Sequence, residues 1–481
     1  MAQPPNIILI ITDQQRFDTI GALGAPYART PHLDRLAREG IAFTSCFVAG
    51  ASCAPSRASL FSGCYPHTAG VMRNADPWRA CWVEDLARAG YHCVNVGKMH
   101  TYPFEAPMGF HERYVVENKD RYLEGRYFFD RWDIAFQANG LERPGRVRYR
   151  ELPDYAERLG AISWDLSGAP EHLHSDVYVG GLARWWVERK PRTQPLFLQV
   201  GFPGPHPPYD PPAAYVEAFR DAAFPLPHPT EAEIEALPAP LRAMRVHNTE
   251  VDHDSIFWSL DPSPAQLQRL WAHYHANVAL IDAQVGALLG ALEEGGYLEN
   301  AVVVFTSDHG DCLGDHGQIQ KWTMHDCITR VPFIVWSPNR FGGGRREEGL
   351  WQQMDLAPAL LELAGVPVPE GWEAVSLLPA LRGDVAQSGR EHVFCEQAGD
   401  NILAGTELMT MVRSATWKLV HYLGVEEGEL YHLPSDPGER SNLWTSEDAT
   451  HRAQRARLLE AVLEWRLRGG LRAPRRAQVL S

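Results

Sequence analysis

The chain has 481 residues, enough for about three domains of roughly 150 residues or for one large α/β domain with an appendage. Hydrophobic residues make up 45% and charged residues 22%, which excludes extended disorder, a collagen repeat and a coiled coil. The net charge of −15 argues against a nucleic-acid partner, which needs a basic surface, but still allows a small anionic substrate in a local cationic pocket.

Near its start the chain carries no sign of a membrane or secretory segment. The longest apolar run there, Ile7–Ile11, is far shorter than the roughly 18 residues that cross a bilayer. No basic segment or small-residue cleavage site accompanies it. The eight cysteines form no CxxC pair, as is usual in a reducing compartment. We therefore expect a cytoplasmic protein with no membrane partner.

Short β-rich runs alternate with helical patterns through most of the chain. The clearest strand candidates are Ile7–Ile11, Tyr91–Val96, Leu196–Val200, Val302–Thr306 and Pro332–Trp336. The spacing of apolar residues predicts helices over Ala265–Glu294 and Met354–Ala364. This alternation predicts an α/β fold with a mostly parallel sheet flanked by helices.

Two stretches interrupt the alternation. Residues 110–180 are rich in Trp, Tyr, Arg and Gly, and residues 203–264 are rich in Pro and acidic residues. Both are typical of the surface excursions that carry specificity in α/β enzymes. The aromatic side chains of the first stretch would line a substrate pocket or belong to the core, which is the commoner role. They are Tyr122, Tyr127, Trp132 and Trp164.

The pattern changes after about residue 380. Met409–Val412 and Trp417–Tyr422 read as antiparallel strands, and a helix is expected from Thr450 to Leu467. We therefore divide the chain into a catalytic α/β domain, residues 1–375, and a small α+β C-terminal subdomain, residues 376–481. The arginine-rich end of the chain is a solvated helix end or an arm that packs on another subunit. A homo-oligomer is expected.

Polar residues directly follow four of the predicted strands. In open α/β sheets ligands bind beyond the carboxyl ends of the strands, so these residues should converge on one crevice. They are Asp13, Gln14, Lys98, His100, His206, Asp308 and His309. Each alone is commonly a turn or surface residue, but their joint position indicates a site. The first and last pairs, Asp13-Gln14 and Asp308-His309, supply oxygen ligands and one nitrogen, which suits Ca²⁺ or Mn²⁺.

The segment around Cys53 is a second candidate feature. Pro55 suits the first position of a short helix and Gly63 suits its end, so Cys53 is expected at or just before the helix N-terminus. That end favours an anion and lowers the pKa of a thiol, and Arg57 adds a positive charge one turn later. Taken alone, a cysteine before a proline is more often structural.

Together these motifs resemble the sulfatase family of the alkaline phosphatase superfamily. Cys53 to Arg57 has the family's C-x-P-S-R form, and Gly97 to His100 is similar to its G-K-x-H signature. Further similar segments are Asn6 to Asp13, Ser307 to Gly310, Gly314 to Gly317 ahead of Lys321, Glu429 to Leu433 and Asp436 to Glu439. The resemblance covers most of the chain. It implies an alkaline phosphatase-like fold and a formylglycine made from Cys53 by a formylglycine-generating maturation enzyme.

The resemblance also implies how a small anionic ester would be attacked. Hydrated formylglycine at position 53 would be a gem-diol, with one hydroxyl activated by a metal for in-line attack on sulfur or phosphorus. The implied metal ligands are Asp13, Gln14, residue 53, Asp308 and His309. The implied cations that neutralise the ester oxygens are Arg57, Lys98 and Lys321.

Proton transfer is assigned to two histidines by the same resemblance. His206, with Lys321, would protonate the leaving oxygen, and His100 would take a proton from the remaining hydroxyl to expel sulfate and regenerate the aldehyde. Asn74 matches a position at which related enzymes touch the substrate.

Two departures from the family pattern bear on the substrate. Many sulfatases have Asp where Gln14 stands and Asn where His309 stands. Gln14 together with Asp308-His309 instead resembles the pattern of the phosphonate monoester hydrolase branch. That branch typically replaces the Lys and His of G-K-x-H, whereas this chain keeps Lys98 and His100. We expect an arylsulfatase-like sulfate monoester hydrolase. The alternatives are phosphonate monoester or phosphodiester hydrolysis, activity on both ester types, a phosphatase that uses unmodified Cys53, or a non-catalytic binding protein.

Overall fold

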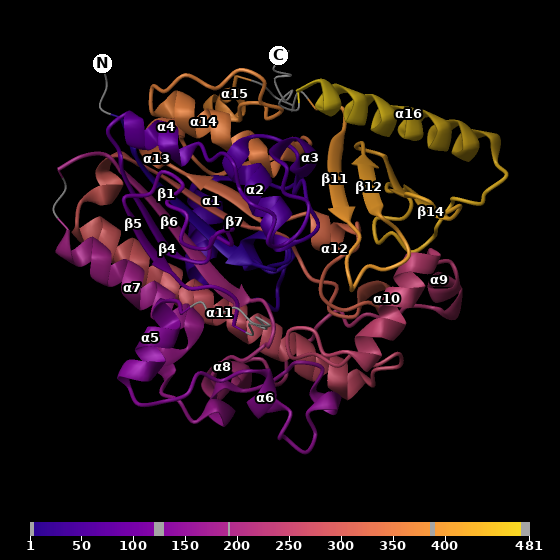
Figure 1. Ribbon diagram of the computed structural model, residues 1–481, viewed down its shortest axis with the longest axis horizontal. Coiled ribbons are helices and arrows are strands. Elements are labelled where there is room, and N and C mark those ends of the chain that lie inside the picture. The colour runs from indigo at the N-terminus through magenta and orange to yellow at the C-terminus, as the bar shows by residue number, and fades with distance from the viewer. Residues whose placement is uncertain (1–3, 120–128, 191–192, 385–389, 473–481) are drawn as a thin grey trace, which may run out of the picture.

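The computed structural model describes residues 4–119, 129–190, 193–384 and 390–472, and a large eight-stranded sheet runs through its centre (Figure 1). The strands of that sheet are β1 (Asn6–Asp13), β2 (Ile41–Phe43), β4 (His92–Gly97), β5 (Glu112–Val115), β6 (Leu196–Pro205), β7 (Ala301–Ser307), β8 (Phe333–Trp336) and β9 (Arg345–Glu347). Their order is β5-β4-β6-β1-β7-β8-β2-β9. Within this sheet only β8 runs against the other strands, which confirms the predicted mostly parallel arrangement.

Strand β1 shows how the sheet separates two hydrophobic layers. Successive side chains of a strand point to opposite faces. Accordingly, Ile7, Leu9 and Ile11 belong to one buried cluster, and Ile8 and Ile10 belong to another. One face is covered by α1 (Pro31–Glu39), α7 (Ser175–Arg189) and α11 (Pro264–Glu294), and the other by α2 (Cys53–Ser62), α4 (Val83–Arg88) and α14 (Leu356–Leu363).

Helix α11 confirms the prediction made for Ala265–Glu294 almost residue for residue. It begins with a capping box, in which the Ser263 side chain accepts from the Gln266 backbone N–H and the Gln266 side chain accepts from that of Ser263. By length and composition it could span a membrane, but 67% of its most apolar window is buried inside the fold. It packs against α7 and α1 beneath the sheet, as a core helix does.

Shorter elements connect these layers. The helices are α3 (Pro66–Ala69), α5 (Arg131–Ala138), α6 (Arg146–Tyr149), α8 (Ala213–Glu217), α9 (Glu231–Glu235), α10 (Ala239–Glu250), α12 (Asp326–Thr329), α13 (Pro338–Phe341) and α15 (Leu378–Arg382). A two-stranded sheet pairs β3 (Cys46–Phe47) with β10 (Trp351–Gln352). In the excursion over residues 110–180, Trp132 and Trp164 are buried and stack at 6.5 Å between ring centroids. They belong to the core rather than to a pocket, and Tyr122 and Tyr127 lie outside the described residues.

A small antiparallel sheet confirms the predicted change of pattern near the C-terminus. It comprises β11 (Val393–Ala398), β12 (Leu408–Arg413), β13 (Trp417–Tyr422) and β14 (Gly428–His432). Helix α16 (Ala449–Arg472) covers one face through Leu458, Val462 and Trp465. On the other face Met409, Met411 and Val420 share a hydrophobic cluster with the large sheet. The division between residues 375 and 376 stays a prediction.

Candidate active site

Strand register brings the predicted polar residues to one edge of the large sheet. Asp13 ends β1 and pairs with Pro205 of β6, which places His206 beside it. On the other side Thr12 pairs with Ser307 of β7, so Asp308 and His309 follow at the same level. These pairings realise the convergence that the sequence predicts.

Lys98 reaches this edge because β4 and β6 approach closely. A Cβ atom on Gly201 would lie 1.9 Å from the Lys98 carbonyl oxygen, and one on Gly97 would lie 2.1 Å from the Gly201 carbonyl oxygen. Gly97 also has a φ of 89°, which strongly favours glycine. The Lys98 backbone N–H donates to the Gly201 carbonyl at 2.8 Å. Two glycines therefore fix the backbone that carries this lysine.

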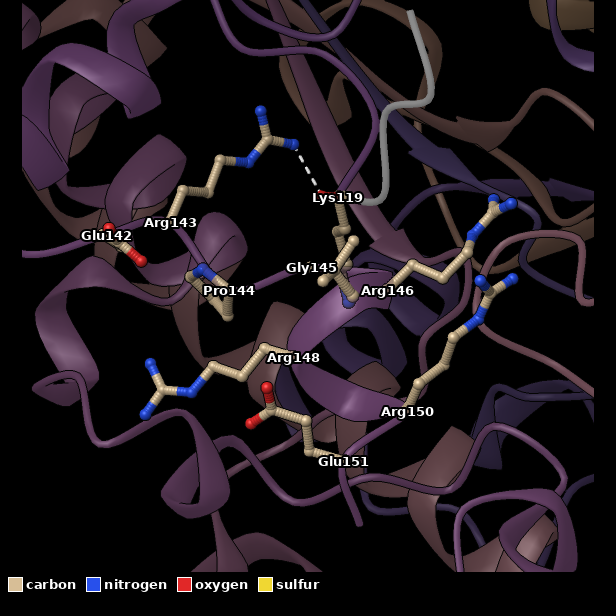
Figure 2. Close-up of a pocket in the computed structure, with 10 residues that line it drawn as sticks. Lys119, Glu142, Arg143, Pro144, Gly145, Arg146, Arg148, Arg150 and Glu151 are labelled. Atoms are coloured by element: carbon tan, nitrogen blue, oxygen red, sulfur yellow. Dashed lines mark hydrogen bonds between the residues drawn. The ribbon is translucent and has the colours of Figure 1, made fainter.

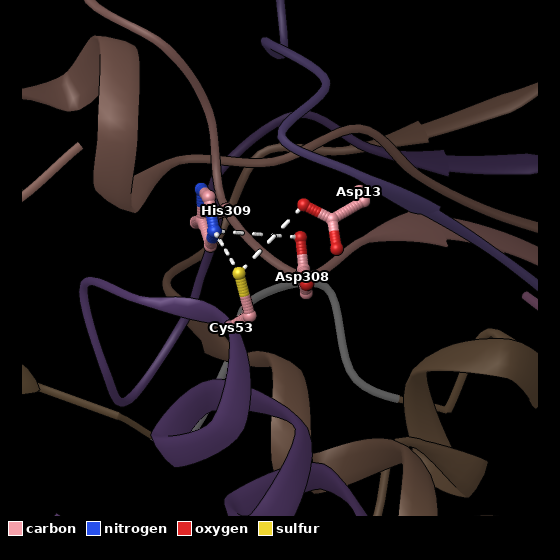
Figure 3. A group of neighbouring side chains, drawn as sticks. All are labelled: Asp13, Cys53, Asp308 and His309. Atoms are coloured by element: carbon pink, nitrogen blue, oxygen red, sulfur yellow. Dashed lines mark hydrogen bonds and ion pairs between the residues drawn. The ribbon is translucent and has the colours of Figure 1, made fainter. Parts of the chain in front are cut away.

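Cys53 is the first residue of α2, as predicted, although Pro55 is the third helical residue and not the first. The helix ends at Gly63, which has a φ of 68°. The Cys53 Sγ lies 3.2 Å from His309 Nε2 and 3.7 Å from Asp13 Oδ1 (Figure 3). It also lies 3.5 Å from Lys321 Nζ. Burial and then the Asp13 carboxylate raise the pKa of the Cys53 thiol, but its cationic neighbours, with Lys321 and Lys98 first, lower it, and the net shift is downward.

Four buried side chains form a group that could hold a metal ion. Donor atoms of Asp13, Cys53, Asp308 and His309 all lie within 4.8 Å of one another (Figure 3). The His309 Nδ1 hydrogen bonds to the Gly310 carbonyl at 2.9 Å, which orients the ring so that Nε2 faces the group. The Cys53 Sγ stands where the oxygens of a formylglycine would lie. Three oxygen positions and one nitrogen are a donor set for a hard or borderline cation.

Three cations surround the two carboxylates of this group. Arg57, fully buried, donates from Nε to Asp308 Oδ2 at 2.7 Å and from Nη1 to the Lys98 carbonyl at 2.9 Å. Lys98 forms an ion pair with Asp13. Burial would raise the pKa of Asp13, but Lys98, followed by other cationic neighbours, holds it well below its usual value. Lys321 is the third cation, so the three positive charges outnumber the two negative charges of the carboxylates.

His206 and Lys321 form a hydrogen-bonded pair beside Cys53. The His206 Nδ1 hydrogen bonds to the Pro207 carbonyl at 2.8 Å, and the His206 Nε2 lies 2.9 Å from Lys321 Nζ. Burial, and then the Lys321 ammonium, lower the pKa of His206 well below its usual value. The pKa of Lys321 is raised: burial opposes this, but Cys53 and Asp254 outweigh it. The transferable proton of the pair therefore resides on the lysine.

Among the described residues, the side-chain contacts of Cys53 include neither His100 nor Asn74. The half-buried His100 has a φ of 62°, and its backbone N–H donates to Glu117 Oε1 at 3.2 Å. Burial, followed by the charge of Lys98, lowers the pKa of His100 to about 4, so the imidazole is neutral at pH 7. Asn74 is exposed in the loop after α3, and no contact joins it to the other predicted residues among those described.

The sequence did not indicate Asp311, which orients Gln14. Asp311 Oδ2 accepts from Gln14 Nε2 and from the Tyr209 hydroxyl, both at 2.6 Å. With its nitrogen held there, the Gln14 amide turns its Oε1 toward Lys321 Nζ, 3.0 Å away. Gln14 also has a φ of 68°. The only sequence signal was the position of Asp311 directly after the Asp308-His309-Gly310 motif.

A separate basic cavity of about 610 Å³ lies beside α6 (Figure 2). Its basic side chains diverge instead of facing one point. Arg143 donates to the Lys119 carbonyl at 2.6 Å, whereas Arg150 donates from Nε to Asp252 Oδ2 at 2.9 Å on the other side. Most of this charge is thus engaged by neighbouring groups of the protein, and the cavity has no candidate nucleophile among the residues that line it.

Comparison with known protein families gives two matches. Residues 5–366 match the family model described as "Sulfatase". Residues 314–466 match the model described as "N-sulphoglucosamine sulphohydrolase, C-terminal".

Individual relatives cover nearly the whole chain. An arylsulfatase of Clostridium perfringens is 28% identical over 97% of this chain and 95% of its own length. An N-acetylglucosamine-6-O-sulfatase of Bacteroides thetaiotaomicron is 24% identical over 95% of this chain and 86% of its own. Among solved structures, the phosphonate monoester hydrolase of Agrobacterium radiobacter superimposes with a TM-score of 0.78 at 25% identity, covering 97% of this chain and 96% of that one.

Proposed function

The chain belongs to the sulfatase family and is a sulfuric ester hydrolase, and on that premise we propose that the group around Cys53 is its active site. A maturation enzyme would convert Cys53 to formylglycine. The observation that carries the proposal is the contact of one buried thiol with a histidine, a lysine and a carboxylate from three different strand ends or loops. The cytoplasmic location and the homo-oligomeric state stay predictions.

The residues present fit a divalent cation. Two buried carboxylates and the Nε2 of His309 converge, and the Gln14 Oε1 lies 3.0 Å from Lys321 Nζ, which is itself 3.5 Å from the Cys53 Sγ of this group. We propose Asp13, Gln14, residue 53, Asp308 and His309 as the ligands of Ca²⁺ or Mn²⁺. When bound, such an ion supplies Lewis-acid polarisation of the ester and a lowered pKa for a coordinated hydroxyl.

The remaining groups of the site act on the ester itself. Arg57, Lys98 and Lys321 supply preorganised positive charge for the sulfuryl oxygens, where it stabilises the transition state more than the ground state. Lys321 donates a proton toward the leaving oxygen with His206 as its hydrogen-bonded partner. His100, neutral because its pKa is about 4, accepts a proton from the nucleophile side when the product leaves.

Phosphonate monoester or phosphodiester hydrolysis is the second candidate function. It is favoured by Gln14 and His309 at the site and by the structural similarity to a phosphonate monoester hydrolase. The two functions are separated by measuring kcat/KM on aryl esters that share one leaving group and differ only in sulfate, phosphonate monoester or phosphodiester. We expect the sulfate to be the best substrate. A phosphonate monoester that is turned over more efficiently would contradict this assignment.

Asp311→Asn is expected to lower the affinity for the metal about 10- to 100-fold, because a carboxamide cannot accept from both Gln14 and Tyr209 without turning its own NH₂ group toward backbone donors. Calorimetric titration of Ca²⁺ or Mn²⁺ into chelator-treated protein measures this directly. Tyr209→Phe serves as the control, because it removes one donor and leaves Gln14 held. Unchanged affinity in the Asp311 variant would show that Gln14 is not a ligand.

His206→Ala is expected to reduce turnover of alkyl sulfates by about 10²-fold and that of nitrophenyl sulfate by less than about 10-fold. Alkoxide leaving groups need a proton in the transition state, whereas nitrophenolate does not. The measurement is kcat/KM across a series of leaving groups. Losses of the same size along the whole series would remove His206 from the proton-transfer step.

A further inference from the structure

A buried carboxylate, that of Glu117, lies beside His100. Glu117 follows the last residue of strand β5 by two positions and is only 2% exposed. Its Oε1 accepts from the His100 backbone N–H at 3.2 Å. Its Oε2 is buried as well and has no hydrogen-bond partner among the residues that the structure describes. A buried carboxylate oxygen without a partner costs free energy, so its presence at this place indicates a role.

The histidine that Glu117 contacts is held in an unusual conformation. The His100 backbone is left-handed, with a φ of 62°, and such backbone persists at a non-glycine residue where the surroundings hold it in place. The hydrogen bond from its N–H to Glu117 is one such hold. The His100 Nδ1 is buried without a hydrogen-bond partner in the described part of the chain. One carboxylate therefore fixes a backbone whose imidazole is itself incompletely paired.

The surroundings of His100 disfavour its protonated form. Burial, and then the charge of Lys98, lower the pKa of the imidazole to about 4. Of the groups that raise this pKa, Glu117 has the largest effect, ahead of Asp13. A neighbouring carboxylate stabilises an imidazolium as it forms. Without Glu117, the acceptance of a proton by His100 would therefore be less favourable still.

A purely structural alternative would make Glu117 the counter-ion of the buried Arg113. Burial lowers the pKa of Arg113, and the charge of Glu117 opposes that shift. The Arg113 guanidinium, however, donates to the side chains of Asn95 and Thr101 at 3.0 Å and 3.2 Å and to backbone carbonyls. No ion pair joins it to Glu117 among the described residues. The direct contact of the Glu117 carboxylate is with His100.

We propose that Glu117 is a positioning residue for His100, which holds its backbone and stabilises the imidazolium that forms when His100 accepts a proton. This inference rests on the proposed function, in which the proton comes from the hydroxyl that remains on residue 53. As the O–H bond breaks, its electron pair closes the aldehyde C=O bond, and the C–O bond to the sulfuryl group breaks with its pair leaving on sulfate. His100 then returns the proton to water. Glu117 therefore acts on the second half of the reaction, after the alcohol has left.

Glu117→Gln tests this, because the amide still accepts from the His100 N–H but carries no charge. With converted protein and nitrophenyl sulfate, we expect kcat to fall about 10²-fold and kcat/KM to change less than about threefold, because kcat/KM does not include steps after nitrophenolate release. Rapid mixing should show a burst of about one nitrophenolate per active site. The intact mass of protein quenched during turnover should rise by about 80 Da, from a retained sulfuryl group. Glu347→Gln, at a buried glutamate of β9 on the opposite edge of the sheet, is the control and should show none of these changes.

Equal losses in kcat and kcat/KM, with no burst and no retained group, would overturn the inference and leave Glu117 with a structural role. A double variant gives a second test: Glu117→Gln should lower kcat little further in a His100→Ala background, because Glu117 acts through that imidazole. A full additional loss there would also overturn it. If converted wild-type protein hydrolyses no aryl sulfate, the proposed function fails instead, and a nitrophenyl phosphonate monoester then serves for the same measurements on Glu117.

Discussion

Cys53→Ala is expected to lower kcat/KM for an aryl sulfate by more than about 10³-fold while leaving the protein folded. Alanine offers no atom that can attack sulfur and cannot be converted to formylglycine. The cations and the other four proposed metal ligands remain, so substrate binding should persist although turnover stops. The free energy of unfolding should change by no more than about 1 kcal/mol, because the substitution removes one sulfur atom and introduces no new polar group.

Steady-state kinetics and thermal unfolding of the variant measure both parts of this expectation. Cys64→Ala is the matched control, since Cys64 is a half-buried cysteine just beyond the C-terminus of the same helix. Intact-mass measurement adds an independent observation, because conversion of the thiol to an aldehyde lowers the mass by about 18 Da. Wild-type rates in Cys53→Ala would refute the nucleophile assignment. Absence of the mass change in fully active protein would refute the modification.

The local pattern of apolar residues in the sequence was sufficient to predict most of the fold. The strands at Ile7–Ile11 and Val302–Thr306 and the helix at Ala265–Glu294 were predicted because apolar periodicity and terminal signals agree there with burial. The reversed direction of β8 was not predictable, because a buried apolar run looks the same in a parallel and in an antiparallel strand. The direction of a strand is set by the end of the sheet at which the chain enters it, and this depends on the loop before the strand.

The site was predictable where a motif and a strand end coincide. Asp13, Asp308 and His309 follow buried strands, and the strand register alone brings them together. Asp311 was missed for a different reason. It acts through a contact with Gln14, a residue far away in the chain, and this contact leaves no local trace in the sequence.

Arg57→Met is expected to lower the free energy of unfolding by about 3–5 kcal/mol and to abolish turnover. The guanidinium is fully buried between Asp308 and Asp13, with Nε 2.7 Å from Asp308 Oδ2 and Nη2 3.4 Å from Asp13 Oδ2. Removing one partner of a buried ion pair leaves an uncompensated charge, which accounts for a loss of this size. The Lys98 carbonyl also loses the Nη1 donor at 2.9 Å and keeps the longer hydrogen bond from Gln199 Nε2 at 3.3 Å. Urea unfolding at pH 7 measures the change.

The same variant separates the structural role of Arg57 from its catalytic role. Arg390→Met is the control, because Arg390 is also largely buried and its Nε donates to Asp355 Oδ2 at 2.7 Å. This ion pair does not include the residues of the group around Cys53. It should lose comparable stability and keep its kcat/KM in the folded fraction. Added Ca²⁺ or Mn²⁺ should stabilise Arg57→Met more than the wild type, because the ion then supplies the counter-charge for both carboxylates. Equal stabilisation by metal in the two proteins would mean that Arg57 and the metal do not share those carboxylates.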